Sequence, residues 1–453
     1  MCGVIGAVGP GSEAVVEAGI HALSHRGIRH RTMSTRWGTI GHTRLPIVGV
    51  GGENDQPVLR GKWLVAFVGE ILDFREYRPG AECDLDTVVD TWSDDGPRGF
   101  CKHDGFWTVM ALDSLTGDLH VIVDYLAQKP AYVRSDRYAR AAASEPNALS
   151  CLGPTTPDEI YFASVIKWGY CPETHRTPYR EIRKMIPGEH LVIHYDGSCD
   201  VEITDDLQAV PTGPSVLRAE LEASVRRRVC SADVPVAALV SGGLDSAIVW
   251  MLARRSGDVQ PYHVENNEVD EAREVLGADW PRVQLATLGG VDLTKALTYM
   301  QEPLDLGSLY PQVALSDAIA EARGERVCLT GDGVDELFGG YSRAHRYDSQ
   351  SSDVWHELVS WHLPRLDRVM MRNRIEIRSP FLSRRVAGAA IALPRGMRTG
   401  KKILRDMFSQ DLPRGITTQP KRALRTADVE IDREGHSMEL VGAFRRMVWP
   451  TGS

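Results

Sequence analysis

The chain has 453 residues, of which 43% are hydrophobic and 25% charged, and its formal net charge at pH 7 is −9. This length exceeds what one ordinary hydrophobic core holds and therefore favours two domains. The negative balance argues against a nucleic-acid partner, and the lack of any apolar run of about 18 residues argues against a membrane-spanning helix.

Eight cysteines are scattered through the sequence. None forms a CxxC pair or stands at zinc-ligand spacing with a histidine, so they favour a reducing compartment and a cytoplasmic location. The first residues are apolar but lack a basic segment and a small-residue cleavage site, which argues against a signal peptide. Seven of the cysteines are interpreted as packing residues, and Cys2 is the exception.

The N-terminal half is predicted to be rich in β-strands. Short apolar runs separated by turn residues indicate strands at 63–68, 107–113 and 119–123. One amphipathic helix is expected at 12–24, with Ser12 as its N-cap.

The stretch 206–214 has the acid, proline and glycine content of a linker, so the chain is expected to divide into domains at 1–205 and 215–453. Beyond the linker, helices and strands alternate. The predicted helices are 216–229 and 247–255, and the predicted strands are 234–240, 262–265, 283–287 and 326–330. This alternation indicates a parallel α/β sheet.

The segment Ser241-Gly242-Gly243-Leu244-Asp245-Ser246 follows the strand at 234–240 and opens the next helix. Paired glycines let the backbone close around a phosphate, and a helix N-terminus supplies unpaired N–H groups. Because the carboxylate of Asp245 would repel phosphate, a cation such as Mg²⁺ is expected between them. The chain has no GxxxxGK[ST] sequence, which excludes a Walker-type loop. The alternative interpretation is an ordinary strand-to-helix turn.

Cys2 becomes the first residue once Met1 is removed. Its α-amine, with a usual pKa of about 8, can then accept the proton of its own thiol, whose usual pKa is about 8.5. An N-terminal cysteine of this kind acts as a nucleophile without a catalytic histidine. A lone cysteine at this position is more often incidental, so the hypothesis depends on the surrounding sequence.

Several further motifs occur in a fixed order along the chain. They are MCGVIG at 1–6, HRG at 25–27, HTRLPI at 42–47, GE at 69–70, SGGLDS at 241–246, LTGDGVDELFGGY at 329–341, EIRSPFL at 376–382 and KKILR at 401–405. This ordered set resembles the glutamine-hydrolysing asparagine synthetases over nearly the whole chain. The resemblance implies an α+β glutaminase sandwich (αββα, N-terminal-nucleophile type) followed by an α/β parallel-sheet adenylating domain.

By this resemblance, Cys2 attacks the side-chain amide of glutamine and releases ammonia. The residues implied in glutamine binding are Arg44, Ile47, Gly69, Glu70 and Asp86. Arg44 would hold the α-carboxylate as a bidentate partner, while Glu70 and Asp86 would receive the α-ammonium group. The stretch ECDLD at 82–86 can also be aligned with Asp84 in that role. The alternative for Arg44 and Glu70 is a surface ion pair.

The second site is implied to bind ATP and Mg²⁺. The residues implied in ATP binding are Leu239, Ser241, Gly242, Gly243, Asp245, Ser246, Val264, Thr330 and Gly331. Asp245 and Asp335 would hold Mg²⁺. Lys401 would neutralise charge as the substrate carboxylate attacks the α-phosphorus, and Asp332 stands at the catalytic acid position of the intermediate site. Ammonia would then convert the acyl-adenylate to an amide, releasing AMP and pyrophosphate.

A few positions depart from the family pattern. Val68 replaces an asparagine that stabilises the oxyanion, which predicts a slow glutaminase because one missing donor can cost about 10²–10³ in rate. Asp332 stands where glutamate is usual, and Ser383 where aspartate is usual. Aspartate is the default acceptor, but these changes leave open a specialised amide synthetase for another carboxylate, or a silent binding relative. The implied partners are glutamine and the carboxylate, and a homodimer is compatible with the resemblance.

Overall fold

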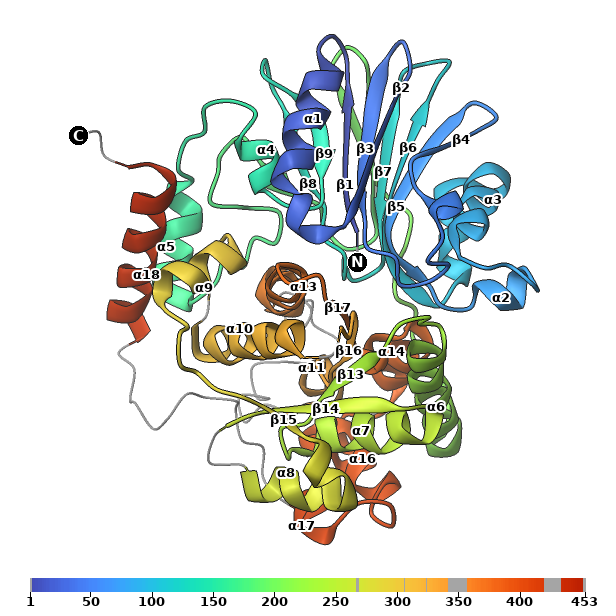
Figure 1. Cartoon of the computed structure of the whole chain (residues 1–453), viewed down its shortest axis with the longest axis vertical. Helices are drawn as coiled ribbons and strands as arrows, with labels where there is room; N and C mark the ends of the chain where they lie inside the picture. The colour runs from blue at the N-terminus through green and yellow to red at the C-terminus, as the bar shows by residue number, and fades with distance from the viewer. Residues whose placement is uncertain are drawn as a thin grey trace.

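The computed structural model describes residues 2–265, 269–304, 306–322, 324–340, 357–418 and 433–450. Two antiparallel sheets stand face to face at one end of the molecule, and a parallel sheet lies at the other end (Figure 1). Tyr341, which closes one of the motifs above, is outside the described residues. Within these ranges, no helix is both long and apolar enough to cross a bilayer.

The first antiparallel sheet brings Cys2 next to Arg44. Its strand order is β10-β8-β9-β1-β3-β2. The strands are β1 (Gly3–Val8), β2 (Arg29–Ser34), β3 (Gly38–Arg44), β8 (Tyr132–Ser135), β9 (Arg140–Ala143) and β10 (Arg183–Lys184). Gly3 of β1 pairs with Thr43 of β3 in antiparallel register. Cys2, immediately before β1, therefore lies beside Arg44 at the end of β3.

The second antiparallel sheet carries Glu70. Its strand order is β12-β11-β7-β6-β5-β4. The strands are β4 (Val58–Arg60), β5 (Trp63–Ile71), β6 (Gly105–Asp113), β7 (Leu119–Val123), β11 (Glu189–Ile193) and β12 (Cys199–Ile203). The strand predicted at 119–123 is confirmed, whereas β5 continues past its predicted end at residue 68. It continues because Gly69 and Glu70 still pair with Trp107 and Phe106 of β6.

Helices cover the outer faces of these two sheets. The helix α1 (Ser12–Ala22) packs on β1 and β3, and α3 (Leu85–Asp95) packs on β5 (Figure 1). The inner faces pack closely, because a Cβ atom on Gly6 of β1 would lie 3.0 Å from Leu119 and 3.2 Å from Met110 of the second sheet. The layers therefore form the predicted α+β sandwich of the αββα, N-terminal-nucleophile type.

The start of α1 differs from the prediction. Gly11, with a φ of 81°, occupies the N-cap position, and no side chain caps the helix. Ser12 is already helical, and its Oγ lies 3.2 Å from Oγ1 of Thr39 on β3. The prediction of Ser12 as the cap is wrong because this hydroxyl is engaged by the neighbouring sheet. The helix also ends at Ala22 rather than at residue 24.

The parallel sheet has the order β15-β14-β13-β16-β17. Its strands are β13 (Val236–Leu239), β14 (Val259–Val264), β15 (Gln284–Ala286), β16 (Val327–Leu329) and β17 (Glu376–Arg378), and its first helices are α6 (Pro214–Cys230) and α7 (Leu244–Ser256). These elements overlap the predicted ones, and the predicted α/β class is confirmed. Chain order reverses between β13 and β16. Open α/β sheets bind ligands at such a switch point, outside the carboxyl ends of the strands.

The C-terminal helix returns to the N-terminal half. The helix α18 (Arg433–Val448) packs against α5 (Glu159–Trp168), and the two lie side by side in Figure 1. Phe444 is fully buried there, with its ring centroid 6.3 Å from that of Phe162. Trp449 adds a second ring, 6.2 Å from Phe162, and its indole N–H donates to the carbonyl of Thr155. The last helix of the chain therefore completes a hydrophobic cluster on α5.

We expect Phe444→Ala to destabilise the protein by about 3–5 kcal/mol, because it leaves a cavity between α18 and α5. The measurement is urea denaturation followed by tryptophan fluorescence. Met438→Ala on the same helix is the control, since Met438 is 53% exposed and its truncation should stay within about 0.5 kcal/mol. Equal effects of the two changes would contradict the packing described here.

Candidate active sites

Cys2 lies at the start of β1 with its backbone carbonyl held from the side. The Nε of Arg26 donates to the Cys2 carbonyl oxygen at 3.0 Å, and the Cys2 Sγ lies 4.0 Å from the carbonyl oxygen of Leu45. Burial raises the pKa of the Cys2 thiol to about 11, although the positive chain terminus opposes this shift. With Met1 in place the thiol is therefore neutral at pH 7, and a base has to take its proton before it can attack.

Arg44 is enclosed by the loop that follows β3. Its guanidinium donates to the carbonyl oxygens of Val48, at 3.2 Å, and of Gly49 and Gly51. Nη1 also donates to the carboxylate of Asp55 at 2.9 Å. A substrate carboxylate at this position would have to share the guanidinium with Asp55. The loop is itself anchored to the parallel-sheet half, because Asp233 donates its N–H to the carbonyl of Ile47 at 2.9 Å.

Glu70 is buried together with Asp84. Asp84 accepts a hydrogen bond from the N–H of Ile71 at 2.8 Å. Burial, and then the nearby charge of Glu376, raise the pKa of Glu70 well above its usual value. Burial also raises the pKa of Asp84 to about 7. Two buried carboxylates beside each other favour binding of a cation such as an α-ammonium group.

Asp86 is not brought to this cluster. Its side chain is 50% exposed and lies 3.5 Å from the guanidinium of Arg78. The structure instead places Asp84, the alternative alignment, next to Glu70, so the prediction of Asp86 in this role needs revision. Asp84 precedes the first residue of α3 and points toward β5, whereas Asp86 is in the first turn of the helix.

The positions next to Glu70 on β5 are restricted. Gly69 has a φ of 124°, and a Cβ atom there would collide with the carbonyl oxygen of Phe106. Only glycine fits this position, because any side chain would collide with that carbonyl group. Val68 is buried and has no donor group. The valine side chain therefore supplies no oxyanion donor, and a slow glutaminase stays a prediction.

The loop at 241–246 lies at the switch point of the parallel sheet. Gly242 has a φ of 83°, and a Cβ atom there would lie 2.7 Å from the N atom of Ala272 on α8 (Val269–Leu276). The hydroxyls of Ser241 and Ser246 are 3.1 Å apart, and Ser246 also donates to the carbonyl of Gly243 at 3.1 Å. These contacts fix the conformation of the loop at the N-terminus of α7, and its binding of phosphate stays a prediction.

The loop after β16 meets this phosphate loop. A Cβ atom on Gly331 would lie 2.8 Å from the Cβ of Asp245, so glycine permits the close approach. Leu239 and Val264 end the neighbouring strands β13 and β14. The structure thus gathers the residues predicted to bind ATP at one edge of the sheet.

Lys401 joins the two predicted metal-binding acids. Its Nζ lies 2.5 Å from Oδ2 of Asp245 on α7 and 2.6 Å from Oδ1 of Asp335 on α11 (Val334–Phe338). Lys401 is buried in a left-handed conformation with a φ of 60°. Burial lowers its pKa, but the two carboxylates outweigh burial and raise it. The residue therefore stays protonated, as a fixed cation at this site.

These two acids also fit Mg²⁺. Asp245 and Asp335 already converge on one cation, and carboxylate oxygens are the ligands that Mg²⁺ prefers. Across the described residues, no group of three or more metal-binding side chains occurs. Such a pair fits an ion that completes its shell with phosphate oxygens and water, as Mg²⁺ does in nucleotide sites.

Asp332 lies three residues before Asp335 in the sequence and contacts Thr330 and Arg365. Its carboxylate accepts a hydrogen bond from the hydroxyl of Thr330, and Oδ1 lies 3.7 Å from the guanidinium of Arg365 on α13 (Leu363–Met371). Ser383 is buried and precedes α14 (Arg384–Ala392). Arg365 was not predicted from the sequence, because it follows no motif that marks a site.

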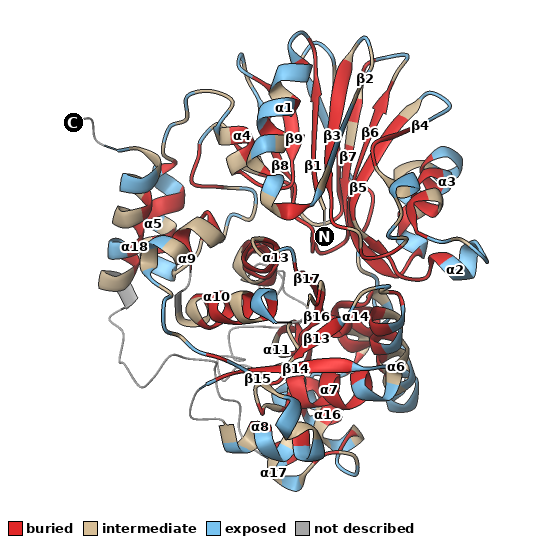
Figure 2. Cartoon of the chain, in the orientation of Figure 1, coloured by how far each residue is buried: buried red, intermediate tan, exposed pale blue. Residues whose placement is uncertain are grey.

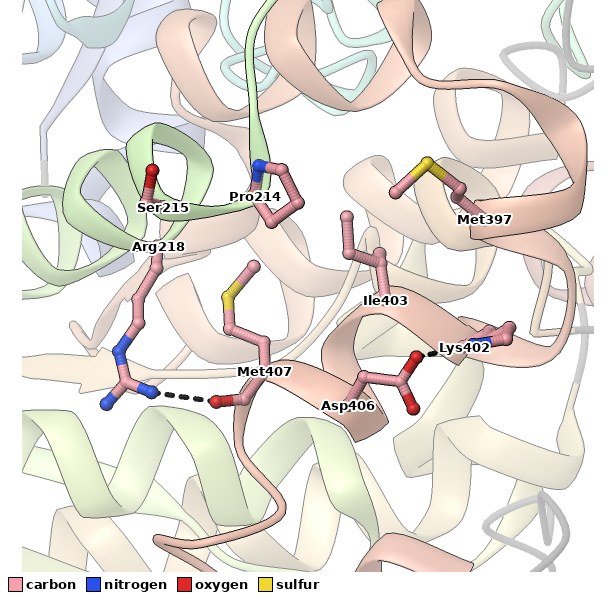
Figure 3. A pocket seen from close by; sticks show the side chains of 8 residues that line it. All are labelled: Pro214, Ser215, Arg218, Met397, Lys402, Ile403, Asp406 and Met407. Carbon is pink, nitrogen blue, oxygen red and sulfur yellow. Dashed lines mark hydrogen bonds and ion pairs between the residues drawn. The ribbon is translucent and has the colours of Figure 1, made fainter.

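A separate hollow of about 320 Å³ lies next to the residues that follow Lys401 (Figure 3). It is lined by Pro214, Ser215, Arg218, Met397, Lys402, Ile403, Asp406 and Met407. Lys402 pairs there with Asp406, at 2.5 Å, whereas the preceding Lys401 faces Asp245. None of the lining residues was predicted to belong to either site, and the hollow is mostly apolar.

The comparison with known proteins agrees with two active regions. Residues 1–202 match the glutamine amidotransferase domain family, and residues 216–362 and 354–441 match the asparagine synthase family. The probable glutamine-hydrolysing asparagine synthetase of Schizosaccharomyces pombe is 26% identical, over 85% of this chain and 74% of that protein. Asparagine synthetase B of Escherichia coli is 25% identical, over 84% of this chain and 73% of that protein.

An amidotransferase region and a synthase region in one chain define a ligase that takes nitrogen from glutamine. The chain belongs to the family of glutamine-hydrolysing asparagine synthetases. Below, the amidotransferase part means residues 1–202 and the synthetase part means residues 216–441.

We expect Asp84→Asn to raise the KM for glutamine about tenfold or more, since a hydrogen bond to a charged group contributes about 1.5–3 kcal/mol. Asp86→Asn is the matched control and should leave this KM unchanged. In the unmodified protein, the ammonium of glutamine needs ionised Asp84, so kcat/KM should fall as pH drops through about 7. Steady-state glutaminase assays measure both effects, and a larger change with Asp86→Asn would restore the original assignment.

Proposed function

We propose that this protein makes asparagine from aspartate, using ATP, Mg²⁺ and the amide nitrogen of glutamine. The observation that carries the proposal is the position of Lys401, held between Asp245 and Asp335 beside the phosphate loop. A protonated lysine fixed in a buried site is suited to stabilise charge that develops on a phosphate. The family membership and the intact Cys2 support the glutamine-dependent half of the reaction.

In the proposed first reaction, Arg44 binds the α-carboxylate of glutamine, and Glu70 with Asp84 binds its α-ammonium. The Cys2 sulfur attacks the side-chain carbonyl carbon, and the α-amine left by removal of Met1 takes the thiol proton. The same proton then passes to the leaving nitrogen, so ammonia departs and a thioester remains. Water hydrolyses the thioester to glutamate and regenerates Cys2.

In the proposed second reaction, a carboxylate oxygen of aspartate attacks the α-phosphorus of ATP and pyrophosphate leaves. Lys401 stabilises the charge on the transferring phosphoryl group. Mg²⁺ held by Asp245 and Asp335 would supply charge neutralisation on the pyrophosphate side. Ammonia then attacks the acyl carbon, AMP leaves, and Asp332 would accept the surplus proton. The products are asparagine, AMP and pyrophosphate.

A second candidate acceptor is a carboxylic acid other than aspartate. Asp332 has a shorter side chain than the glutamate usual in the family, and Arg365 stands 3.7 Å from it as an additional cation. An exchange assay of ATP with labelled pyrophosphate, run over a panel of carboxylic acids, separates the two candidates. Exchange with aspartate supports the main proposal, and exchange with only another acid supports the second.

We expect Cys2→Ala to abolish asparagine formation from glutamine while leaving ammonia-dependent formation intact, because the adenylating site does not use the thiol. The measurement is mass spectrometry of asparagine, AMP and glutamate with each nitrogen source. The unmodified protein with both nitrogen sources is the reference. Equal loss with glutamine and with ammonia would refute separate sites, and ADP as the main nucleotide product would refute adenylation.

We expect Lys401→Ala to lower the adenylation rate by about 10² or more, because loss of one preorganised electrostatic group costs this much in comparable sites. Glutamine hydrolysis should change little. Lys402→Ala is the matched control, since Lys402 is 64% exposed and pairs with Asp406 in the separate hollow. Pyrophosphate release measures adenylation. An active Lys401→Ala protein, or an equally impaired Lys402→Ala protein, would contradict the role proposed for Lys401.

A further inference from the structure

The helix α13 lies between the two active sites. Figure 1 shows it between the sandwich and the parallel sheet, and all of its residues are buried (Figure 2). Successive residues of an α-helix are rotated by about 100°, so two residues separated by two positions point about 200° apart. Arg365 and Asp367 are such a pair. They face opposite sides of the helix. Arg365 lies near Asp332, and Asp367 binds Arg26, which in turn binds the Cys2 backbone.

Asp367 faces the amidotransferase part. Its Oδ2 accepts a hydrogen bond from Nη2 of Arg26 at 2.9 Å, and its Oδ1 accepts one from Nζ of Lys129 at 3.2 Å. The same Arg26 donates to the carbonyl of Cys2 at 3.0 Å and pairs with Glu145 at 2.6 Å. One guanidinium therefore joins the synthetase helix directly to the backbone of the nucleophile.

Arg365 faces the other side of the helix, where its guanidinium lies 3.7 Å from the carboxylate of Asp332. The segment before α13 is also fixed by the amidotransferase part, because Lys184 donates to the carbonyls of Val359 and Ser360, each at 3.2 Å. A displacement of α13 near Asp332 would consequently move Asp367, and with it the position of Arg26 beside Cys2.

A second series of contacts also connects the glutamine site with Asp332. Arg378 on β17 lies 3.6 Å from Glu70 of the glutamine pocket. The backbone carbonyl of Arg378 accepts a hydrogen bond from the N–H of Thr330 at 3.1 Å, and the hydroxyl of Thr330 binds Asp332. The helix α13 and the strand β17 thus each connect a residue next to the glutamine site with Asp332.

We propose that Asp367 is a positioning residue for the glutaminase step, and that through α13 the occupancy of the acceptor site changes the reactivity of Cys2. Asp367 fixes Arg26, and Arg26 fixes the Cys2 carbonyl, only while α13 holds its position. ATP and acceptor that displace Arg365 from Asp332 shift the same helix. This inference rests on the proposed function, because it assigns Asp332 to the acceptor site.

The test compares the full-length protein with Asp367→Asn and Asp104→Asn. Asp104 is the matched control, because it is also a buried acid that joins the two parts, through Arg227 at 3.2 Å and Arg228 at 3.5 Å on α6, but it has no contact with α13 among those described. The rate of Cys2 alkylation by iodoacetamide is followed by mass spectrometry of the Cys2 peptide, with and without ATP, Mg²⁺ and aspartate.

We expect these ligands to change the alkylation rate about fivefold in the unmodified protein and in Asp104→Asn, as is common for coupled sites. Asp367→Asn should lose this response while keeping ammonia-dependent asparagine synthesis, which shows that it is folded. A full response in Asp367→Asn, no response in the unmodified protein, or equal loss in Asp104→Asn would each overturn the proposal.

A second measurement leaves α13 unaltered and covers the case in which Asp367→Asn fails to fold. In Cys2→Ala protein, calorimetry gives the Kd for glutamine with and without aspartate and a non-hydrolysable ATP analogue. Because the proposed displacement of α13 alters the glutamine site at Cys2, we expect this Kd to shift by about fivefold, within the range typical of coupled sites, and an unchanged Kd would overturn the proposal. Failure of the proposed function is distinguishable, because it removes asparagine synthesis with ammonia as well as with glutamine.

Discussion

The charge of Arg26 has to be balanced inside the protein, because its side chain is almost completely buried. Removing one partner from a buried ion pair costs about 3–5 kcal/mol, since it leaves a charge without compensation. Glu145 comes from the amidotransferase part and Asp367 from the synthetase part. Glu145 balances one positive charge, but the buried Lys129 of the amidotransferase part adds a second beside it, so Asp367 of the synthetase part is needed to balance both. The electrostatic requirement sets the relative position of the two sites more strictly than apolar packing, which tolerates sliding.

A second buried ionic group next to Asp367 also reaches the amidotransferase part. Arg368, the residue after Asp367, donates to the carbonyl of Met300 at 2.7 Å and pairs with Glu302 at 2.9 Å. Glu302 also accepts from the hydroxyl of Tyr161 at 3.1 Å. Buried hydrogen bonds are directional, so a network of this kind specifies one arrangement where an apolar interface would permit several.

Local patterns in the sequence predicted much of the fold. The alternation of helices and strands after residue 214 and the strand at 119–123 depend on side-chain periodicity, which each segment carries in itself. The cap of α1 was mispredicted because Ser12 has a partner, Thr39, on another strand. Element ends were least accurate where pairing continues through an unusual residue, as β5 does through Gly69.

In the candidate sites, too, local motifs were predictable from the sequence, whereas contacts between distant residues were not. Motifs predicted Cys2 and Lys401 as catalytic residues, whereas the contacts of Lys401 with Asp245 and Asp335 became visible only in the structure. Asp84 and Asp86 could not be separated by spacing alone, because the difference depends on where α3 begins. The contact between Arg26 and Asp367 joins residues 341 positions apart and has no local signature in a single sequence. Long-range pairs of this kind require the folded chain.

The packing of α18 on α5 has a consequence for synthesis on the ribosome. Chains emerge from the N-terminus, and domains generally begin to fold as they emerge. The apolar face of α5, including Phe162, is made long before Phe444 and Trp449 exist. That face lacks these two partners until Phe444 and Trp449 have left the exit tunnel. A chain that stops early would therefore carry an exposed apolar patch, a feature by which quality-control factors distinguish unfinished proteins from complete ones.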